Sequence, residues 1–175
     1  MVVKFKAIKP KQLDIKLIRE ELKRTMDGEI KPTLLADHEQ TVRGWERKVS
    51  FRTWSKVGPR GTPIEVRVYT TDEVWNYLDK GTRPHVIRAK RAKNLRFRAG
   101  PYTPKTIPGR LVSGRGGYAA GPWVSTPEVM HPGTEARNWT KMIIEKRRQW
   151  FNSTMTSAMW RGLQKTGHSR LKVRR

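Results

Sequence analysis

The chain has 175 residues, no cysteine, and 38 Lys and Arg against 15 Asp and Glu, which gives a formal net charge of +23. This length suffices for a hydrophobic core, and the lack of cysteine excludes disulfides and cysteine-bound metals. No apolar run approaches the ~20 residues of a membrane-spanning helix, and the first six residues do not resemble a signal peptide. We therefore expect a soluble protein made in the cytoplasm, with no membrane partner.

The positive charge is concentrated in the second half of the chain. Residues 1–80 have 17 basic and 12 acidic side chains, whereas residues 81–175 have 21 basic and 3 acidic ones. Charge of this size repels itself in a compact state and calls for an anionic surrounding. The composition therefore predicts nucleic acid, an acidic protein surface, or both, as the partner.

The first residues predict two helices. Residues 11–26 place apolar side chains at helical spacing. Asp27-Gly28 and Pro32 are expected to interrupt this helix, and Thr33 to cap a second one that reaches about Trp45.

The next segments predict a strand hairpin followed by a short helix. Residues 49–53 alternate as a half-buried strand, 58–61 form a turn, and 64–69 give the clearest strand pattern. Thr70 and Glu73 have the spacing of a capping box. They are expected to open a helix through Leu78, which Gly81 ends.

The second half predicts short strands, a long loop and a long helix. Strands are expected at 86–87, at 95–97 and over 123–130, where Pro127 marks an edge or a bulge. Residues 100–122 are rich in Gly and Pro and lack periodicity, as in a functional or locally disordered loop. The long helix is expected from Asn138 through Leu163.

These elements define an α+β fold class. We expect a small antiparallel sheet packed by an N-terminal helix and a long C-terminal helix. They form one domain over residues 1–165, with an extended loop at 100–122 and a basic C-terminal tail at 166–175.

Two related segments, which we call the corner segments, lie about fifty residues apart, at 81–87 (Gly-Thr-Arg-Pro-His-Val-Ile) and 131–137 (His-Pro-Gly-Thr-Glu-Ala-Arg). Neither has the spacing of a nucleotide loop, a metal cluster or a catalytic triad. Glycine permits positive φ and proline fixes its own φ, so these residues indicate structural corners. The corner candidates are Gly81, Thr82, Pro84, His85, His131, Pro132, Gly133 and Thr134.

These segments resemble the tail-completion, or neck, proteins of long-tailed double-stranded-DNA bacteriophages. Residues 74–87 are similar to the family's aromatic-rich helix followed by E-x-G-T-x-P-H-x-I, with Asp79 in place of the Glu. Residues 95–97 match its L-x-F strand, and 131–137 match its H-P-G-T-x-A signature. Where family members have Pro-Phe, this chain has Asn138-Trp139, which keeps the aromatic position but not the proline.

The resemblance covers about residues 11–165 and implies an assembly role without catalysis, cofactor or metal. Such proteins form a ring, commonly of six subunits, in the virion neck. The implied partners are head-side connector, adaptor or stopper proteins, tail terminator and tail tube proteins, and genomic double-stranded DNA in the lumen. Relative to a compact member of the family, the loop at 100–122 looks like an insertion.

Basic and aromatic side chains supply the candidate contacts. Phosphate contact needs charge but no particular motif, so the basic residues suit either DNA or a partner ring. The basic candidates are Arg88, Lys90, Arg91, Lys93, Arg96, Arg98, Lys105, Arg110 and Arg115. The aromatic candidates for the core or a subunit interface are Trp75, Tyr77, Trp123, Trp139 and Trp150.

Two other classes of function compete with the neck role. A nucleic-acid-binding module, for packaging or associated with ribosomes, explains the charge but not the paired corner segments. A nuclease or another enzyme is disfavoured, since no clustered carboxylates or metal-ligand spacing occur. We expect His85 and His131 to make structural hydrogen bonds, and Asp72, Glu73 and Asp79 to serve capping and a solvated helix face.

Overall fold

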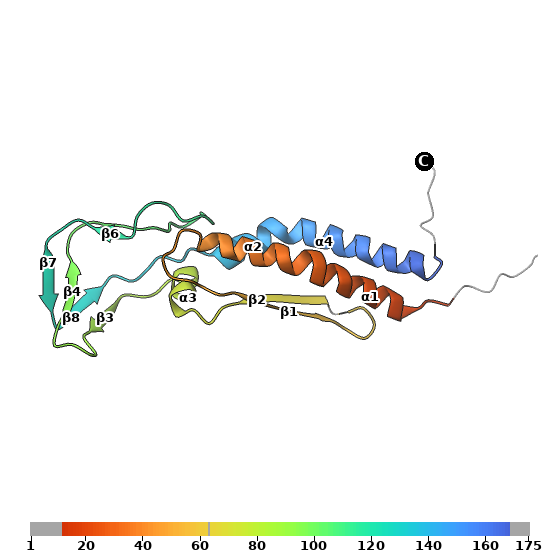
Figure 1. Ribbon diagram of the computed structural model, residues 1–175, viewed down its shortest axis with the longest axis horizontal. Helices are drawn as coiled ribbons and strands as arrows, with labels where there is room; N and C mark the ends of the chain where they lie inside the picture. Colours follow the sequence, from red (N-terminus) through yellow and green to blue (C-terminus); the bar gives the residue numbers. More distant parts are fainter. Residues whose placement is uncertain (1–11, 63, 169–175) are drawn as a thin grey trace, which may run out of the picture. The chain divides into compact units, whose positions relative to one another are not determined.

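The computed structural model describes residues 12–62 and 64–168, and the fold is α+β, as predicted (Figure 1). The described residues divide into two compact units, one from residues 12–32, 54–62, 64–67 and 148–168 and the other from 33–53 and 68–147. Four elements contribute residues to both units. The division into units does not test the predicted single domain over residues 1–165, which stays a prediction. The four elements are α2 (Lys31–Thr41), β1 (Arg52–Val57), β2 (Ile64–Tyr69) and α4 (Trp139–Lys165).

The termini fall partly beyond this description. The start of the predicted first helix at Lys11, and the part of the predicted tail from residue 169 on, lie outside the described residues. None of the helices in the described ranges combines the length and the apolar character that crossing a bilayer demands.

The first helix does not break where the sequence predicts. α1 (Ile15–Thr25) passes into a π-helical turn, η1 (Met26–Ile30), and then into α2, so the expected interruption and the Thr33 cap are wrong. Pro32 has no N–H and its ring crowds the carbonyl four residues back. In the wider π turn the Lys31 N–H bonds to the Met26 carbonyl, five residues back, which accommodates the proline. The second helix ends at Thr41, short of the predicted Trp45.

In the first unit, α1 and α4 approach each other closely. A Cβ built on Gly162 of α4 would lie 2.6 Å from the Ile18 Cα. Glu21 on α1 is buried and accepts hydrogen bonds from Arg161 (2.8 Å) and Lys165 (2.6 Å) of α4, and from Arg24 (2.6 Å). Hydrogen bonds from Arg24 and then Lys165 lower the pKa of the Glu21 carboxyl to about 2.

This carboxylate should make the first unit sensitive to acid. A carboxyl whose pKa is lowered by folding adds stability that is complete above about pH 4.5 and is lost as the pH falls toward 2. We expect Glu21→Gln to cost on the order of 2 kcal/mol at pH 7 and much less near pH 2. Urea unfolding across this pH range measures the difference, with Glu20→Gln, on the exposed side of α1, as the control. A cost that does not change with pH contradicts the account.

β1 and β2 pair with each other across the predicted turn, in which the Gly61 N–H donates to the Gly58 carbonyl (2.9 Å). So short a connection joins antiparallel strands. The first strand begins at Arg52 rather than at 49, because Phe51 packs edge-on against Trp75, with ring centroids 5.3 Å apart, in the core of the second unit.

Five rings form the core of the second unit. Trp75, from α3 (Glu73–Lys80), and Trp139 are buried with centroids 5.7 Å apart, and Trp45 lies 6.4 Å from Trp139. Phe51 and His38 complete the cluster, each within 6.1 Å of Trp75. Stacked and tilted aromatic pairs of this kind bury large apolar areas. The cluster therefore anchors the elements around it.

The loop at 100–122 is fastened to this core. The Trp139 indole N–H donates to the Arg110 carbonyl (2.8 Å), and the Trp45 indole N–H donates to the Ser113 hydroxyl (3.0 Å). That hydroxyl donates to the Thr41 carbonyl (3.0 Å). Buried indole N–H groups need partners, and the loop supplies two of them. The long Gly/Pro-rich loop that the sequence predicts is therefore present, and hydrogen bonds hold it to the core.

The loop also holds two short strands, which belong to a nested series of antiparallel pairs that we call the ribbon. The pairs are β3 (His85–Arg88) with β8 (Glu128–His131), β4 (Leu95–Arg98) with β7 (Trp123–Thr126), and β5 (Tyr102–Thr103) with β6 (Tyr118–Ala119). β3 and β4 confirm two predicted strands. The predicted strand over 123–130 is instead two strands, separated at Pro127, whose nitrogen has no hydrogen to donate to a ladder.

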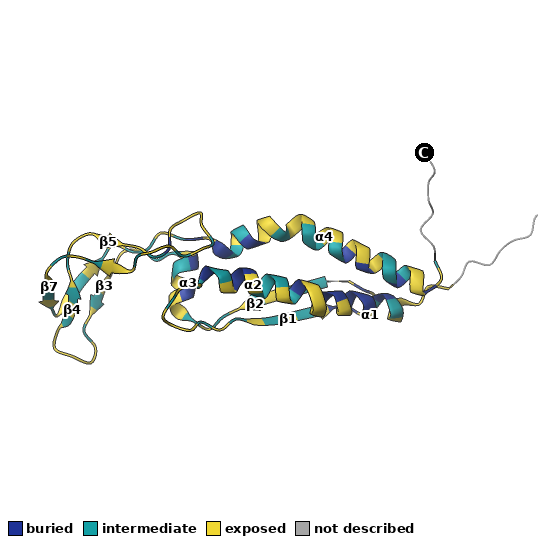
Figure 2. Cartoon of the chain, turned by 45° about the horizontal axis from the view of Figure 1, so that its top comes forward, coloured by how far each residue is buried: buried dark blue, intermediate teal, exposed yellow. Residues whose placement is uncertain are grey.

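The ribbon has one uneven place. Between Arg88 and Leu95 one edge has the six residues 89–94, whereas Pro127 alone separates β7 from β8 on the other edge. Residues 89–94, which we call the basic loop, therefore bulge out of the ladder. At the start of this loop the Ala89 N–H donates a hydrogen bond to the Pro127 carbonyl (3.1 Å). None of the residues in β3, β4, β7 and β8 is buried (Figure 2).

Candidate nucleic-acid interface

The two corner segments meet at the base of the ribbon. Thr82 and Thr134 exchange backbone hydrogen bonds of 2.8 and 3.0 Å, and His85 pairs with His131. The structure thus joins residues that are about fifty positions apart in the sequence.

Both glycines in these segments have positive φ and no room for a side chain. Gly81 has φ +75°, and a Cβ there would lie 2.8 Å from the Thr134 carbonyl oxygen and 2.9 Å from the Ala136 nitrogen. Gly133 has φ +89°, and its Cβ would overlap the Thr82 carbonyl oxygen. The backbones can pair at this distance only because both residues are glycine.

The two histidine rings lie next to each other in a tilted arrangement, with centroids 5.1 Å apart and an angle of 33° between their planes. The Nδ1 of His85 lies 2.8 Å from the Arg83 carbonyl, to which it must donate, and the His131 Nδ1 accepts from the Gly133 N–H (3.0 Å). Pro84 directly precedes β3 and Pro132 directly follows β8. Within residues 12–62 and 64–168, no three His, Asp or Glu side chains cluster as metal ligands would.

The base of the ribbon continues into the start of α4. The backbone N–H of Asn138 donates to the Asp79 carbonyl (3.0 Å). The Asp79 carboxylate accepts from the Thr140 N–H (3.1 Å) and hydroxyl (2.7 Å) in the first turn of α4. Asp79 is buried, so its predicted solvated position is wrong. It caps α4, while Asp72, instead of Thr70, caps α3 by accepting from Trp75 N–H.

Asn138 explains why this chain lacks the proline that the resemblance would place there. Its φ is +54°, the one positive φ of a non-glycine residue among those described. Proline is restricted to φ near −65°, whereas asparagine is among the residues that tolerate this region best. The chain therefore enters α4 through a conformation that proline cannot adopt.

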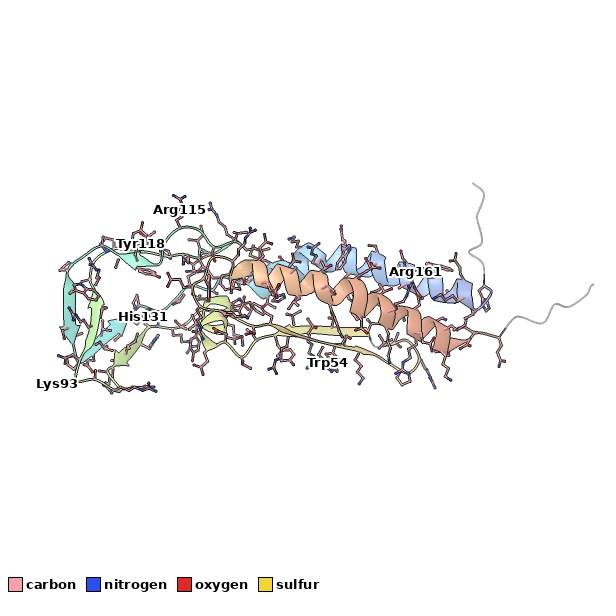
Figure 3. The ribbon with its side chains drawn as sticks, viewed as in Figure 1. Trp54, Lys93, Arg115, Tyr118, His131 and Arg161 are labelled. Atoms are coloured by element: carbon pink, nitrogen blue, oxygen red, sulfur yellow. The ribbon has the colours of Figure 1, made fainter. Side chains whose placement is uncertain are left out.

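The structure gathers six of the nine basic candidates on the ribbon and leaves three in the 100–122 loop. Arg88, Lys90, Arg91, Lys93, Arg96 and Arg98 are all exposed (Lys93 is labelled in Figure 3). Arg88 makes an exposed salt bridge to Glu128 (3.0 Å). In the loop, Lys105 donates to the Gly44 carbonyl (3.1 Å), whereas the Arg110 and Arg115 side chains are exposed.

The aromatic candidates divide between core and surface. Trp75 and Trp139 are core residues, and Trp150 is half-buried on α4. Tyr77 and Trp123 are instead 54% and 57% exposed. The Trp123 ring carries two guanidinium groups, with the Cζ of Arg96 5.0 Å and the Cζ of Arg98 5.2 Å from its centroid. The sequence alone could not indicate this cluster, because it depends on the register that sets Trp123 opposite Arg98.

Comparison of the chain with protein-family models, with curated proteins and with solved structures finds no match. A functional assignment therefore depends on the geometry of this chain and on the motifs in its sequence. The geometry offers a glycine-dependent base, a ribbon without buried residues, and exposed basic side chains along it.

Proposed function

We propose that the chain is a structural protein of the neck of a long-tailed DNA bacteriophage. It assembles as a homo-oligomeric ring of about six copies in the virion. The ring joins head-side connector, adaptor or stopper proteins to the tail terminator and tail tube, around the channel for double-stranded DNA. The observation that carries the proposal is the pairing of the two corner segments. It brings the residues on which the family resemblance depends into contact with one another.

The exposed ribbon supports an assembly role. A two-stranded ribbon without a buried face is marginally stable by itself in water. None of the residues in β3, β4, β7 and β8 is buried, although Leu95, Phe97 and Val124 are half-buried on one face. Neighbouring subunits or partner proteins in a ring would cover such a face.

The charge supports a location around DNA. Six copies carry six times the +23 of one chain, which repel one another unless anions lie between them. Packaged DNA supplies a dense array of phosphates. Contacts to phosphates carry no sequence information, so DNA of any sequence can slide past them.

The alternative is a free nucleic-acid-binding protein with a role in packaging or on ribosomes. The exposed Trp123 with its two arginines favours it, since basic side chains beside exposed aromatic rings are typical of proteins that bind single-stranded nucleic acid. The alternative predicts tight binding by the monomer. The neck protein should bind DNA weakly when alone and become ordered with its partners.

Cryo-electron microscopy of virions, averaged over the head–tail junction, distinguishes these two functions. A symmetric ring of density that fits both units of this chain at the junction is the expected result. Absence of the chain from purified virions would reject the neck role and favour the free nucleic-acid-binding protein.

A further inference from the structure

We infer that Arg96 and Arg98, held on the ring of Trp123, form a binding site for the phosphodiester backbone of double-stranded DNA. The inference rests on the proposed function and deepens it. It assigns to DNA two of the nine basic candidates, which the sequence leaves open between DNA and partner proteins.

The register of β4 and β7 places these side chains on one exposed face. Arg98 pairs with Trp123 and Arg96 with Ser125, and all four residues are exposed. Side chains alternate between the two faces of a ladder, so Leu95, Phe97, Val124 and Thr126 share the opposite face. The latter four are all half-buried. The polar face is therefore the one available to a ligand.

The indole ring orders both guanidinium groups. A guanidinium over an aromatic ring is attracted by the ring's negative face, and its N–H donors point away along its own plane. Two such planes offer paired N–H donors, which suit the oxygens of a phosphate. Within the described part of the chain, neither arginine has a carboxylate within salt-bridge distance.

A second tryptophan–arginine pair can be compared with the Trp123 cluster. In the first unit, Trp54 is 42% exposed and the Arg67 Cζ lies 5.2 Å from its centroid, but Arg67 is paired with Glu65. That pair is already neutralised by its own carboxylate. The Trp123 cluster keeps two uncompensated charges, so it has the stronger attraction for an anion.

The surroundings favour a polyanion over an isolated carboxylate. The basic loop adds Lys90, Arg91 and Lys93 on the same ribbon, all exposed. A duplex presents a phosphate about every 1.7 Å along its axis, so it can engage the cluster and the loop together. An acidic protein segment that bound both the Trp123 cluster and the basic loop would need carboxylates as closely spaced as the phosphates of a duplex.

Fluorescence anisotropy with a labelled duplex of about 30 base pairs, in salt from about 20 to 200 mM, tests the site. The double variant Arg96→Ala/Arg98→Ala should lower affinity at least tenfold and reduce the salt slope by about 2. Arg52→Ala/Lys56→Ala removes the same charge from exposed positions on β1, outside the ribbon, and should lower affinity less than threefold. Circular dichroism of each variant establishes that it is folded.

Tryptophan substitutions test whether affinity depends on the ordering of the arginines by the indole ring or on their charge alone. Trp123→Leu removes no charge but should lower affinity about fivefold, because the guanidinium groups lose their support. Trp54→Leu is the matched control and should bind as the wild type does. Equal losses in the two double variants, or wild-type binding by Trp123→Leu, would overturn the inference.

The failure of this inference can be told apart from the failure of the proposed function. No binding of DNA by the wild-type chain even at about 20 mM salt rejects the phosphodiester site, and binding to an acidic peptide instead does the same. The neck role is decided separately by density at the head–tail junction. A ring there without contact between Arg96 or Arg98 and DNA also rejects the site.

Discussion

Gly81→Ala should destabilise the second unit by about 3 kcal/mol, whereas Gly109→Ala should cost only about 1 kcal/mol. Both glycines have φ +75°, which is unfavourable for alanine, and Gly81 also has ψ 169°, a combination that essentially only glycine adopts. They differ in space, since a Cβ on Gly81 would lie 2.8 Å from the Thr134 carbonyl oxygen, and one on Gly109 meets nothing within 4 Å. The difference between the two variants therefore measures the geometry of the corner at Gly81, that is, its backbone conformation together with its close pairing.

Urea unfolding followed by tryptophan fluorescence reports on this unit, because Trp75 and Trp139 are buried in it. Gly133→Ala should behave as Gly81→Ala does, since its Cβ would overlap the Thr82 carbonyl. In the proposed ring, both variants should also fail to assemble. If Gly81→Ala and Gly109→Ala lose the same stability, neither the close pairing nor the ψ of Gly81 makes the corner depend on glycine.

Gly162→Ala should destabilise the first unit by about 2 kcal/mol or more, against the usual preference of helices for alanine. The added Cβ would lie 2.6 Å from the Ile18 Cα and 3.2 Å from its Cβ, so α1 and α4 must separate. Separation would also stretch the hydrogen bonds that Arg161 and Lys165 donate to Glu21.

Gly28→Ala is the matched control for this substitution. Gly28 lies in η1 and has nothing within 4 Å of its Cβ position, so alanine there should be neutral or stabilise by up to about 1 kcal/mol. Thermal unfolding followed by circular dichroism measures both variants. A rise in Tm for Gly162→Ala, as for Gly28→Ala, would mean that the two helices do not depend on glycine at their contact.

Elements with a strong local pattern could be predicted from the sequence. The strand at Ile64–Tyr69, the helix α3 and the long helix α4 follow from alternation and helical spacing, which are local properties. The π turn and the shift of β1 could not be predicted in the same way. They depend on the accommodation of Pro32 and on the packing of Phe51 against Trp75, which only the folded chain brings together.

The candidate site was predictable in its residues but not in its arrangement. The sequence picks out both corner segments, yet their pairing requires the nested order of the strands. It also picks out Arg96, Arg98 and Trp123 separately, without the register that assembles them. The burial of the Glu21 and Asp37 carboxylates gave no local signal. Only Arg24 lies near Glu21 in the sequence, whereas Arg161 and Lys165, and the Lys146 and Arg147 that bind Asp37, lie more than a hundred residues further along the chain.

The nesting of the ribbon also has a consequence for the order of folding. The entropy lost on closing a loop grows with its length, so the innermost pair, β5 with β6, loses the least entropy when it forms first. Each pair that forms shortens the loop that the next pair must close, from β4 with β7 to β3 with β8. On this route Gly81 and Gly133 come together last, and the base acquires its geometry only after the chain between them is in place.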